Sequence, residues 1–211
     1  MRLYRFLSSE VEYETCYGLY SKEDVNHHAT ESEWNAAGDD DRFYRYGRMA
    51  RCQPAYRLSP NLMTFVQFRS AWSDVPFNRF FQRATGVPLA ASPLESVNAF
   101  NEGDFLRVHA DALEDRQLAV VLYLSHGWQG EYGGALELTD RHGEVTTVVP
   151  AFNSLLLFDV RAESTHRVLP VQSAAGGRAR LSMGGWLSRR QPDRSASTAS
   201  QTSGRNERSR G

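Results

Sequence analysis

The segment that decides the fold reads Phe105-Leu-Arg-Val-His-Ala-Asp-Ala-Leu-Glu-Asp-Arg-Gln-Leu-Ala-Val-Val-Leu-Tyr-Leu-Ser125. It contains two short runs typical of β-strands, an alternating run at 105–110 and an apolar run at 118–125. Short strands separated by turn residues such as Gly133-Gly134, at about 8–12-residue spacing, predict an all-β sandwich or barrel. Six further runs of this kind lie at 94–100, 135–139, 144–149, 154–158, 167–171 and 180–187.

The residues ahead of these strands have a mixed, largely helical pattern. Ser59-Pro60 is typical of an N-cap followed by a first-turn proline and predicts a helix to about residue 72. Asp74 opens a second predicted helix that ends at Gly86. Helices followed by strands predict an α+β protein, with helices packed outside a double-sheet jelly roll. We expect a single domain over 1–190, with a helical part at 1–90 and a jelly-roll core at 91–190, followed by a disordered Arg/Ser-rich tail at 191–211.

The composition is that of an ordinary globular protein. The 211 residues are 41% hydrophobic and 23% charged, which excludes collagen, coiled coil and wholesale disorder. The chain lacks an apolar run long enough to span a membrane, its first residues lack a signal-peptide pattern, and Cys16 and Cys52 are too few for a disulfide scaffold. We therefore expect a cytoplasmic protein without a membrane partner and assign no chemistry to either thiol.

The net charge of −1 conceals an uneven distribution along the chain. The stretch from Arg189 to Gly211 carries +4, which leaves −5 for the rest of the protein. An acidic body argues against nucleic acid as a partner. The sequence gives no indication of the oligomeric state.

A metal site is predicted from three residues that are far apart in the chain. His109 and Asp111 lie two positions apart, so on an extended strand they point to the same face. His166 follows 57 residues later, after the apolar run 154–158. Two histidines and one carboxylate make the facial triad of non-haem Fe(II) sites, which leaves coordination positions open.

A candidate anion site follows on the last predicted strand. Arg180 and Ser182 share one face of that strand, because they are two residues apart. A guanidinium binds a carboxylate through two parallel hydrogen bonds, and a serine hydroxyl can add a third. This pair therefore suits the distal carboxylate of a small diacid whose other end chelates the metal.

In this order and spacing, the motifs resemble the prolyl-4-hydroxylase-like branch of the Fe(II)/2-oxoglutarate-dependent dioxygenases. The resemblance covers residues 94–188, and the first ninety residues and the tail carry none that we rely on. Besides the metal triad and Arg180-x-Ser182-x-x-Gly185-Trp186, the matching segments are 100–111, 121–125, Trp128 with the Gly133-Gly134 turn, and 166–171.

The resemblance implies a function and a role for each matched residue. His109, Asp111 and His166 would be catalytic ligands of Fe(II), and Arg180, helped by Tyr123 and Ser182, would hold the cosubstrate 2-oxoglutarate. The fold would be a double-stranded β-helix. The enzyme would use O₂, with ascorbate as an optional reductant, to hydroxylate an unactivated C–H bond and release succinate and CO₂. The substrate would be a small molecule such as an amino acid or biosynthetic intermediate, or else a peptidyl residue.

Three positions refine this expectation. Asp111 favours hydroxylation over halogenation, because the related halogenases have a small residue there. Phe100 stands where the branch usually has a tyrosine, so a hydroxyl donor is missing. The stretch 174–177 lengthens the interval between His166 and the arginine, which makes Arg178 a competitor of Arg180 for the carboxylate.

Several other segments are interpreted separately from the matched motifs. The basic, aromatic stretch 42–51 is best interpreted as an amphipathic strand, with a contact to a carboxylate-bearing substrate as the second interpretation. Arg161 is interpreted as a surface residue and His27-His28 as a solvated pair, whereas Glu131 and His126 are expected to line the pocket. Two other function classes remain open: a zinc hydrolase that uses the same three ligands, and a non-catalytic jelly-roll binding protein.

Overall fold

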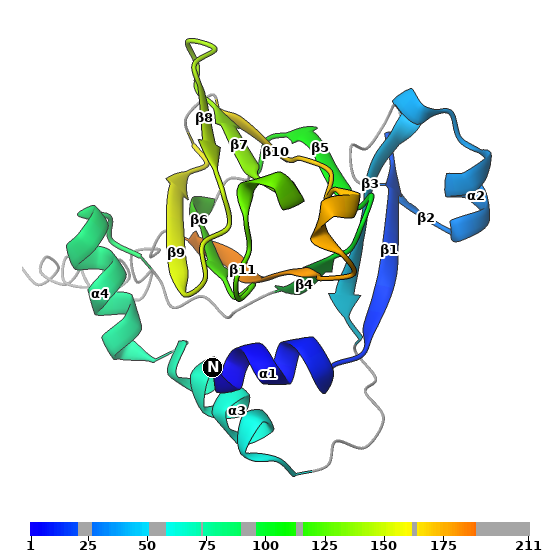
Figure 1. Cartoon of the computed structure of the whole chain (residues 1–211). Coiled ribbons are helices and arrows are strands. Elements are labelled where there is room, and N and C mark those ends of the chain that lie inside the picture. The colour runs from blue at the N-terminus through cyan, green and yellow to red at the C-terminus, as the bar shows by residue number, and fades with distance from the viewer. Residues whose placement is uncertain are drawn as a thin grey trace, which may run out of the picture.

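In the computed structural model, eleven strands form one antiparallel sheet that curls into an open barrel (Figure 1). The structure describes residues 1–20, 27–50, 58–72, 74–89, 96–112, 116–161 and 164–188. The core strands are β4 (Ser96–Phe100), β5 (Phe105–His109), β6 (Arg116–Tyr123), β7 (Leu136–Thr139), β8 (Val145–Val148), β9 (Ser154–Asp159), β10 (Thr165–Val168) and β11 (Arg180–Ser188). Before them come β1 (Tyr13–Leu19), β2 (His27–Ala29) and β3 (Arg42–Met49).

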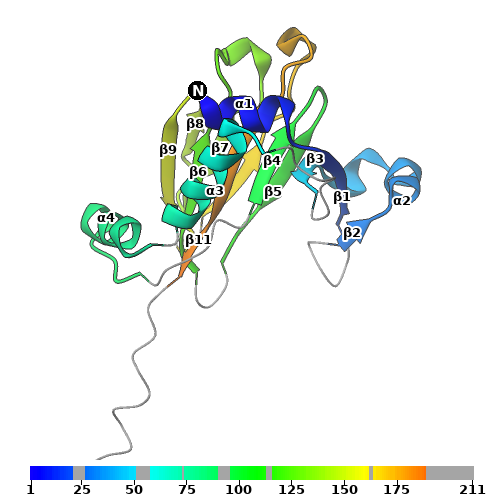
Figure 2. The same cartoon turned by 90° about the horizontal axis from the view of Figure 1, so that it is seen from below.

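The helices cover the outer face of one wall of the barrel. They are α1 (Arg2–Ser9), α3 (Pro60–Trp72) and α4 (Val75–Thr85), while the short α2 (Glu31–Ala36) lies beside β1 and β2. Figure 2 shows α1 and α3 crossing that wall. Their buried side chains, such as Phe6 and Phe65, pack against Leu181 and Met183 of β11. This apolar layer fixes the wall whose opposite face lines the interior.

Side-chain alternation decides what the interior contains. In β11, Leu181 and Met183 face the helices, whereas Arg180 and Ser182 line the cavity on the other side. A strand with one apolar face and one polar face inside a barrel is typical of a ligand site rather than a filled core.

Strand β3 joins the two walls of the barrel. It pairs with β4 through Gly47 and Arg48, and with β5 through Tyr44 and Arg45. The complete order is β8-β7-β10-β5-β3-β4-β11-β6-β9, and β1 pairs with β3 outside this path. The N-terminal part of the chain is therefore built into the barrel itself.

Much of the predicted fold is confirmed. All eight strands predicted after residue 94 are present, as are the helices at 60–72 and 75–85, and the α+β jelly-roll class is correct. The strand expected at 42–51 is present as β3, and the first ninety residues contain two further strands that were not expected, β1 and β2. The predicted tail at 191–211 falls outside the described residues. No helix in the described part is both long and apolar enough to cross a membrane.

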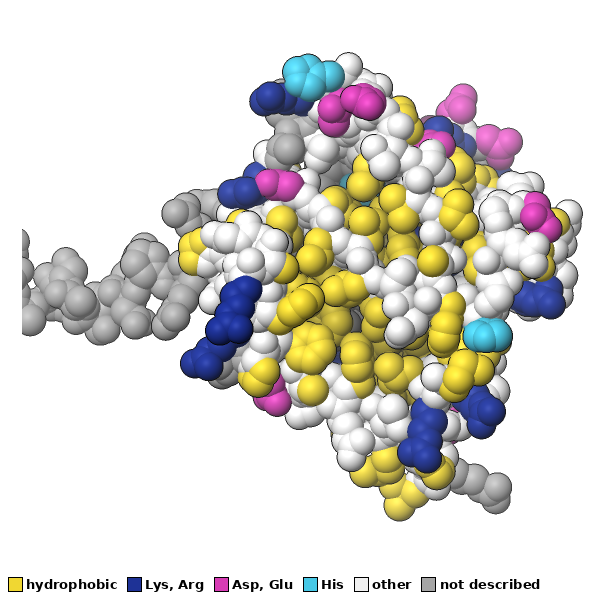
Figure 3. Space-filling model, turned by 60° about the vertical axis from the view of Figure 1, so that its left-hand side comes forward, with side chains coloured by type: hydrophobic (Ala, Val, Ile, Leu, Met, Phe, Trp, Pro, Cys, Tyr) yellow, Lys and Arg dark blue, Asp and Glu magenta, His cyan; other side chains and the backbone are white. Residues whose placement is uncertain are grey.

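Apolar side chains also gather on one outer face of the molecule (Figure 3). Exposed large apolar residues include Phe80 of α4 and Leu155 of β9.

Candidate active site

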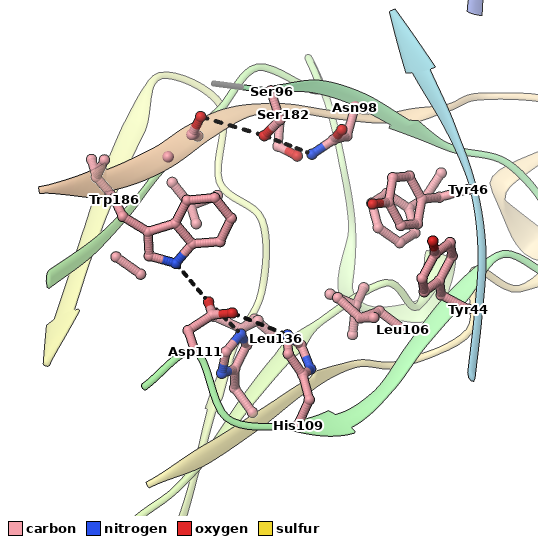
Figure 4. A pocket seen from close by; sticks show the side chains of 18 of the residues that line it. Tyr44, Tyr46, Ser96, Asn98, Leu106, His109, Asp111, Leu136, Ser182 and Trp186 are labelled. Atoms are coloured by element: carbon pink, nitrogen blue, oxygen red, sulfur yellow. Dashed lines mark hydrogen bonds and ion pairs between the residues drawn. The ribbon is translucent and has the colours of Figure 1, made fainter. Parts of the chain in front are cut away.

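The three predicted metal ligands meet in one cavity of about 270 Å³ inside the barrel. His109 ends β5 and is the direct cross-strand partner of His166 on β10. Asp111 follows β5, and its carboxylate lies 3.7 Å from His109 Nε2 and 3.4 Å from His166 Nε2 (Figure 4). One ligand atom from each residue lies within 4.8 Å of the others. Pairing of β5 with β10 thus brings together ligands that are far apart in the sequence.

A bulge in β5 turns His109 inward. Val168 pairs with Leu106 while His166 pairs with His109, so β5 has one more residue than β10 between these pairs. Such a bulge redirects the side chains that follow it. Both Leu106 and His109 line the cavity as a result, although strict alternation would place them on opposite faces.

The charge states of these groups suit a divalent cation. Burial, reinforced by the neighbouring His166, lowers the pKa of His109, so its ring is neutral at pH 7. Burial acts to raise the pKa of Asp111, but His166, His109 and Trp186 outweigh it, and the pKa lies below its ordinary value. A metal site needs neutral histidine and ionised carboxylate ligands, and His109 and Asp111 fit that need.

Two residues orient the Asp111 carboxylate from behind. Trp186 Nε1 donates a 2.9 Å hydrogen bond to Asp111 Oδ2 (Figure 4). Arg116 stacks over the Trp186 ring at 3.5 Å and places one nitrogen 3.8 Å from Asp111 Oδ1. His109 Nδ1 lies 3.0 Å from the carbonyl oxygen of Arg107. Partners of this kind set the geometry and basicity of metal ligands.

Arg180 lies on the opposite wall of the cavity and is 2% exposed. Its Nε donates to the carbonyl oxygen of Gly134 at 2.7 Å, and Nη1 lies 3.4 Å from Ser182 Oγ. The guanidinium stands 5.1 Å from the Tyr123 ring centre. Within the described residues, no carboxylate pairs with this buried cation.

Unpaired polar atoms beside Arg180 indicate a missing ligand. The Tyr123 hydroxyl is buried without a hydrogen-bond partner among the described residues, and burial raises its pKa against the pull of the Arg180 charge. An orphaned buried hydroxyl costs stability unless something pairs with it. A carboxylate would satisfy both groups, so these residues fit the distal end of 2-oxoglutarate.

The remaining predictions differ in outcome. Arg178 stacks near Tyr132 and lines a separate cavity under α1, so of these two candidates it is Arg180 that lines the cavity of the metal ligands. The expectation that Glu131 and His126 line the pocket is wrong: Glu131 is exposed on a short 3-10 turn, and His126 lines the cavity under α1.

Other residues singled out from the sequence lie away from the metal ligands. Arg161 forms a surface pair with Asp159, as expected. Within the described residues, the only cluster with metal-ligand geometry is His109, Asp111 and His166. The side chain of His28 instead contacts Tyr44.

Several cavity residues were not assigned from the sequence, and four of them are polar or aromatic side chains near the site. Arg116 was not considered, and Tyr44, Tyr46 and Arg48 were noted only as part of the stretch 42–51. The period-two alternation of that stretch was the available signal, because it places these three side chains on one face of a strand.

Gly134 is predicted to be essential for placing Arg180. Its φ is +66°, and a Cβ there would lie 2.8 Å from Arg180 Cδ. We expect Gly134→Ala to cost about 1–2 kcal/mol in the free energy of unfolding and to weaken 2-oxoglutarate binding. Gly143→Ala is the matched control, since Gly143 has φ +81° with open space around it. It should lose stability only, as measured by urea unfolding and ligand titration. Equal binding by both variants would refute the steric role of Gly134.

Comparison with known proteins agrees with this geometry. Residues 95–188 match the family model described as the 2OG-Fe(II) oxygenase superfamily. Prolyl 3-hydroxylase OGFOD1 of Mus musculus is 34% identical over 117 residues, which are 53% of this chain and 21% of that protein. Prolyl 3,4-dihydroxylase OGFOD1 of Ostreococcus tauri is 30% identical over 139 residues, 60% of this chain and 27% of that protein. The chain therefore spans only about a quarter of these relatives.

Solved structures show the same architecture. A prolyl-4-hydroxylase from Pseudomonas putida superposes with a TM-score of 0.50 at 28% identity, covering 69% of this chain and 74% of that one. An oxidoreductase of the 2OG-Fe(II) oxygenase family from Burkholderia pseudomallei gives a TM-score of 0.52 at 17% identity, covering 88% and 76%. The second likeness supports the fold alone.

Proposed function

From the match of residues 95–188 to the 2OG-Fe(II) oxygenase superfamily, we propose that this chain hydroxylates a proline residue of a peptide or protein, using Fe(II), 2-oxoglutarate and O₂. One observation carries the proposal: a cluster of two histidines and an aspartate faces, across one cavity, a buried arginine that has no carboxylate partner among the described residues. The proline assignment is supported by the names of the similar proteins, which include prolyl 3-hydroxylases and a prolyl-4-hydroxylase.

Metal binding and cosubstrate binding would be carried out by residues on two different walls of the barrel. His109, Asp111 and His166 would hold the metal, which supplies the oxidation chemistry when bound with O₂ and 2-oxoglutarate. Arg180 and Tyr123 would hold the distal carboxylate of the cosubstrate by charge-assisted hydrogen bonds. Trp186 and Arg116 would keep Asp111 oriented, and Asp111 would remain ionised throughout.

Aromatic side chains make the rest of the cavity suited to a proline ring. Tyr44 and Tyr46 of β3 and Trp186 of β11 line it together with Leu106 and Leu136 (Figure 4). Rings and aliphatic groups bury a saturated five-membered ring favourably, and they exclude water from the metal.

The proposal is tested by assaying the full chain with Fe(II), 2-oxoglutarate and ascorbate. Proline-containing peptides and free amino acids, including proline, are supplied in parallel. We expect release of succinate and a mass gain of one oxygen atom on the proline of some peptides. Oxidation of free amino acids alone would overturn the peptidyl assignment. Turnover with Zn²⁺ in the absence of 2-oxoglutarate would instead favour a hydrolase.

A further inference from the structure

Tyr46 occupies a defined place in a row of side chains that crosses three strands. Phe100 of β4 is the direct partner of Arg180 of β11, and the Arg180 guanidinium lies 4.9 Å from the Phe100 ring centre. Tyr46 of β3 stacks on the Phe100 ring. The two ring centres are 5.0 Å apart, and the angle between the ring planes is 20°. Tyr46 is therefore one ring away from the carboxylate anchor.

The hydroxyl of Tyr46 is directed into the cavity. Tyr46 lines the same cavity as the metal ligands, and Figure 4 shows its ring turned inward beside Tyr44. Among the described residues, no hydrogen bond joins its hydroxyl to another group, and its neighbours there are the rings of Tyr44 and Phe100. Tyr44 differs, because its hydroxyl is paired with His28 Nδ1 at 2.5 Å.

The surroundings of Tyr46 keep its hydroxyl protonated. Burial raises its pKa, and the negative charge of Asp111 acts in the same direction. A protonated phenol can donate a hydrogen bond to an anion, whereas the neighbouring Phe100 ring has no donor to offer. Tyr46 therefore adds a donor to the polar groups that line the cavity, which include Arg180, Ser182 and Asn98.

We propose that the Tyr46 hydroxyl donates a hydrogen bond to a carboxylate oxygen of bound 2-oxoglutarate. The assignment rests on the proposed function, and it adds a binding residue from β3 that lies outside the matched segment 95–188. Because Arg180 lies against the Phe100 ring on which Tyr46 stacks, a small diacid held by Arg180 would lie near the Tyr46–Phe100 stack. The ligand then gains a partner that the oxygenase domain by itself does not supply.

The test is a direct binding measurement on the full chain loaded with Fe(II) without oxygen. 2-Oxoglutarate is titrated by calorimetry into the wild type, Tyr46→Phe and Tyr44→Phe. Tyr46→Phe keeps the stacked ring and removes only the hydroxyl, so we expect its Kd for 2-oxoglutarate to rise about tenfold, as for loss of one hydrogen bond to a charged group. Tyr44→Phe should stay within twofold, because that hydroxyl is paired with His28. The Fe(II) affinity of both variants should not change.

The outcomes separate this inference from the proposed function. No binding of 2-oxoglutarate to the wild type would overturn the proposed function together with this assignment. Tight binding to the wild type and equal binding to Tyr46→Phe would overturn the assignment alone. Equal weakening in Tyr44→Phe and Tyr46→Phe would also overturn it, because the effect would then come from disturbed packing. As a rescue, Phe100→Tyr in the Tyr46→Phe background returns a hydroxyl to the same row and should recover part of the affinity.

Discussion

Replacement of Asp111 by alanine should abolish hydroxylation. The carboxylate is the single anionic member of the metal cluster, and it is held by Trp186 on one oxygen and faces Arg116 on the other. Loss of an outer-shell partner typically costs about 10–100-fold in metal affinity or activity, and loss of the ligand itself should exceed that range. Succinate release and Fe(II) affinity, measured on the purified variant, check the expectation.

The control for this variant is Asp40→Ala. Asp40 is an exposed aspartate on a short 3-10 turn, and the change should leave turnover and metal affinity as in the wild type. Full turnover by Asp111→Ala would show that the ligand is wrongly assigned. Retained metal binding with lost turnover would point instead to a role for Asp111 other than ligation.

The second large effect is expected at Arg180. Arg180→Lys keeps the charge but loses the planar fork that pairs with both oxygens of a carboxylate, and a methylene group replaces Nε, which leaves the Gly134 carbonyl without its donor. Loss of a hydrogen bond to a charged group costs about 1.5–3 kcal/mol, so the KM for 2-oxoglutarate should rise roughly 10–150-fold.

Arg178→Lys is the matched control, two residues away on the same segment. Arg178 lines the cavity under α1 rather than the cavity of the metal ligands, so its replacement should leave the KM for 2-oxoglutarate within twofold. A reversed pattern, with the larger effect at Arg178, would transfer the anchor role to that residue. Steady-state kinetics at saturating Fe(II) and O₂ distinguishes the two cases.

The sequence carried strong signals for the strands and for the ligand types. Each core strand is a short apolar or alternating run, and several of the connections carry turn residues such as Gly133-Gly134, so local pattern alone located all eight. His109 and Asp111 are close in sequence, and a shared direction could be inferred for them. His166 could be added only because two histidines and a carboxylate form a known set of ligands.

The features that could not be predicted depend on long-range pairing. The alternation at 42–51 indicated a strand, but nothing local shows that β3 pairs with β4 and β5, about fifty residues later. The alternation places Tyr44 and Tyr46 on one face of the strand, but it does not show that this face lines the cavity. The bulge in β5 was equally hidden, because it is defined by the register with β10. His126 was misplaced because it follows β6 toward the outside of the barrel.

The position of β3 sets a lower limit on how far the protein can be truncated. A fragment that consists of residues 95–188 alone would lack β3, the strand that pairs with both β4 and β5. The edges of β4 and β5 would then be unpaired and would face each other across a gap. Bare edges of this kind invite aggregation. The smallest fragment that keeps β4 and β5 joined must therefore begin at or before Arg42. Replacing the sequence of β3 with that of another strand would change part of the cavity lining while the metal ligands stay in place.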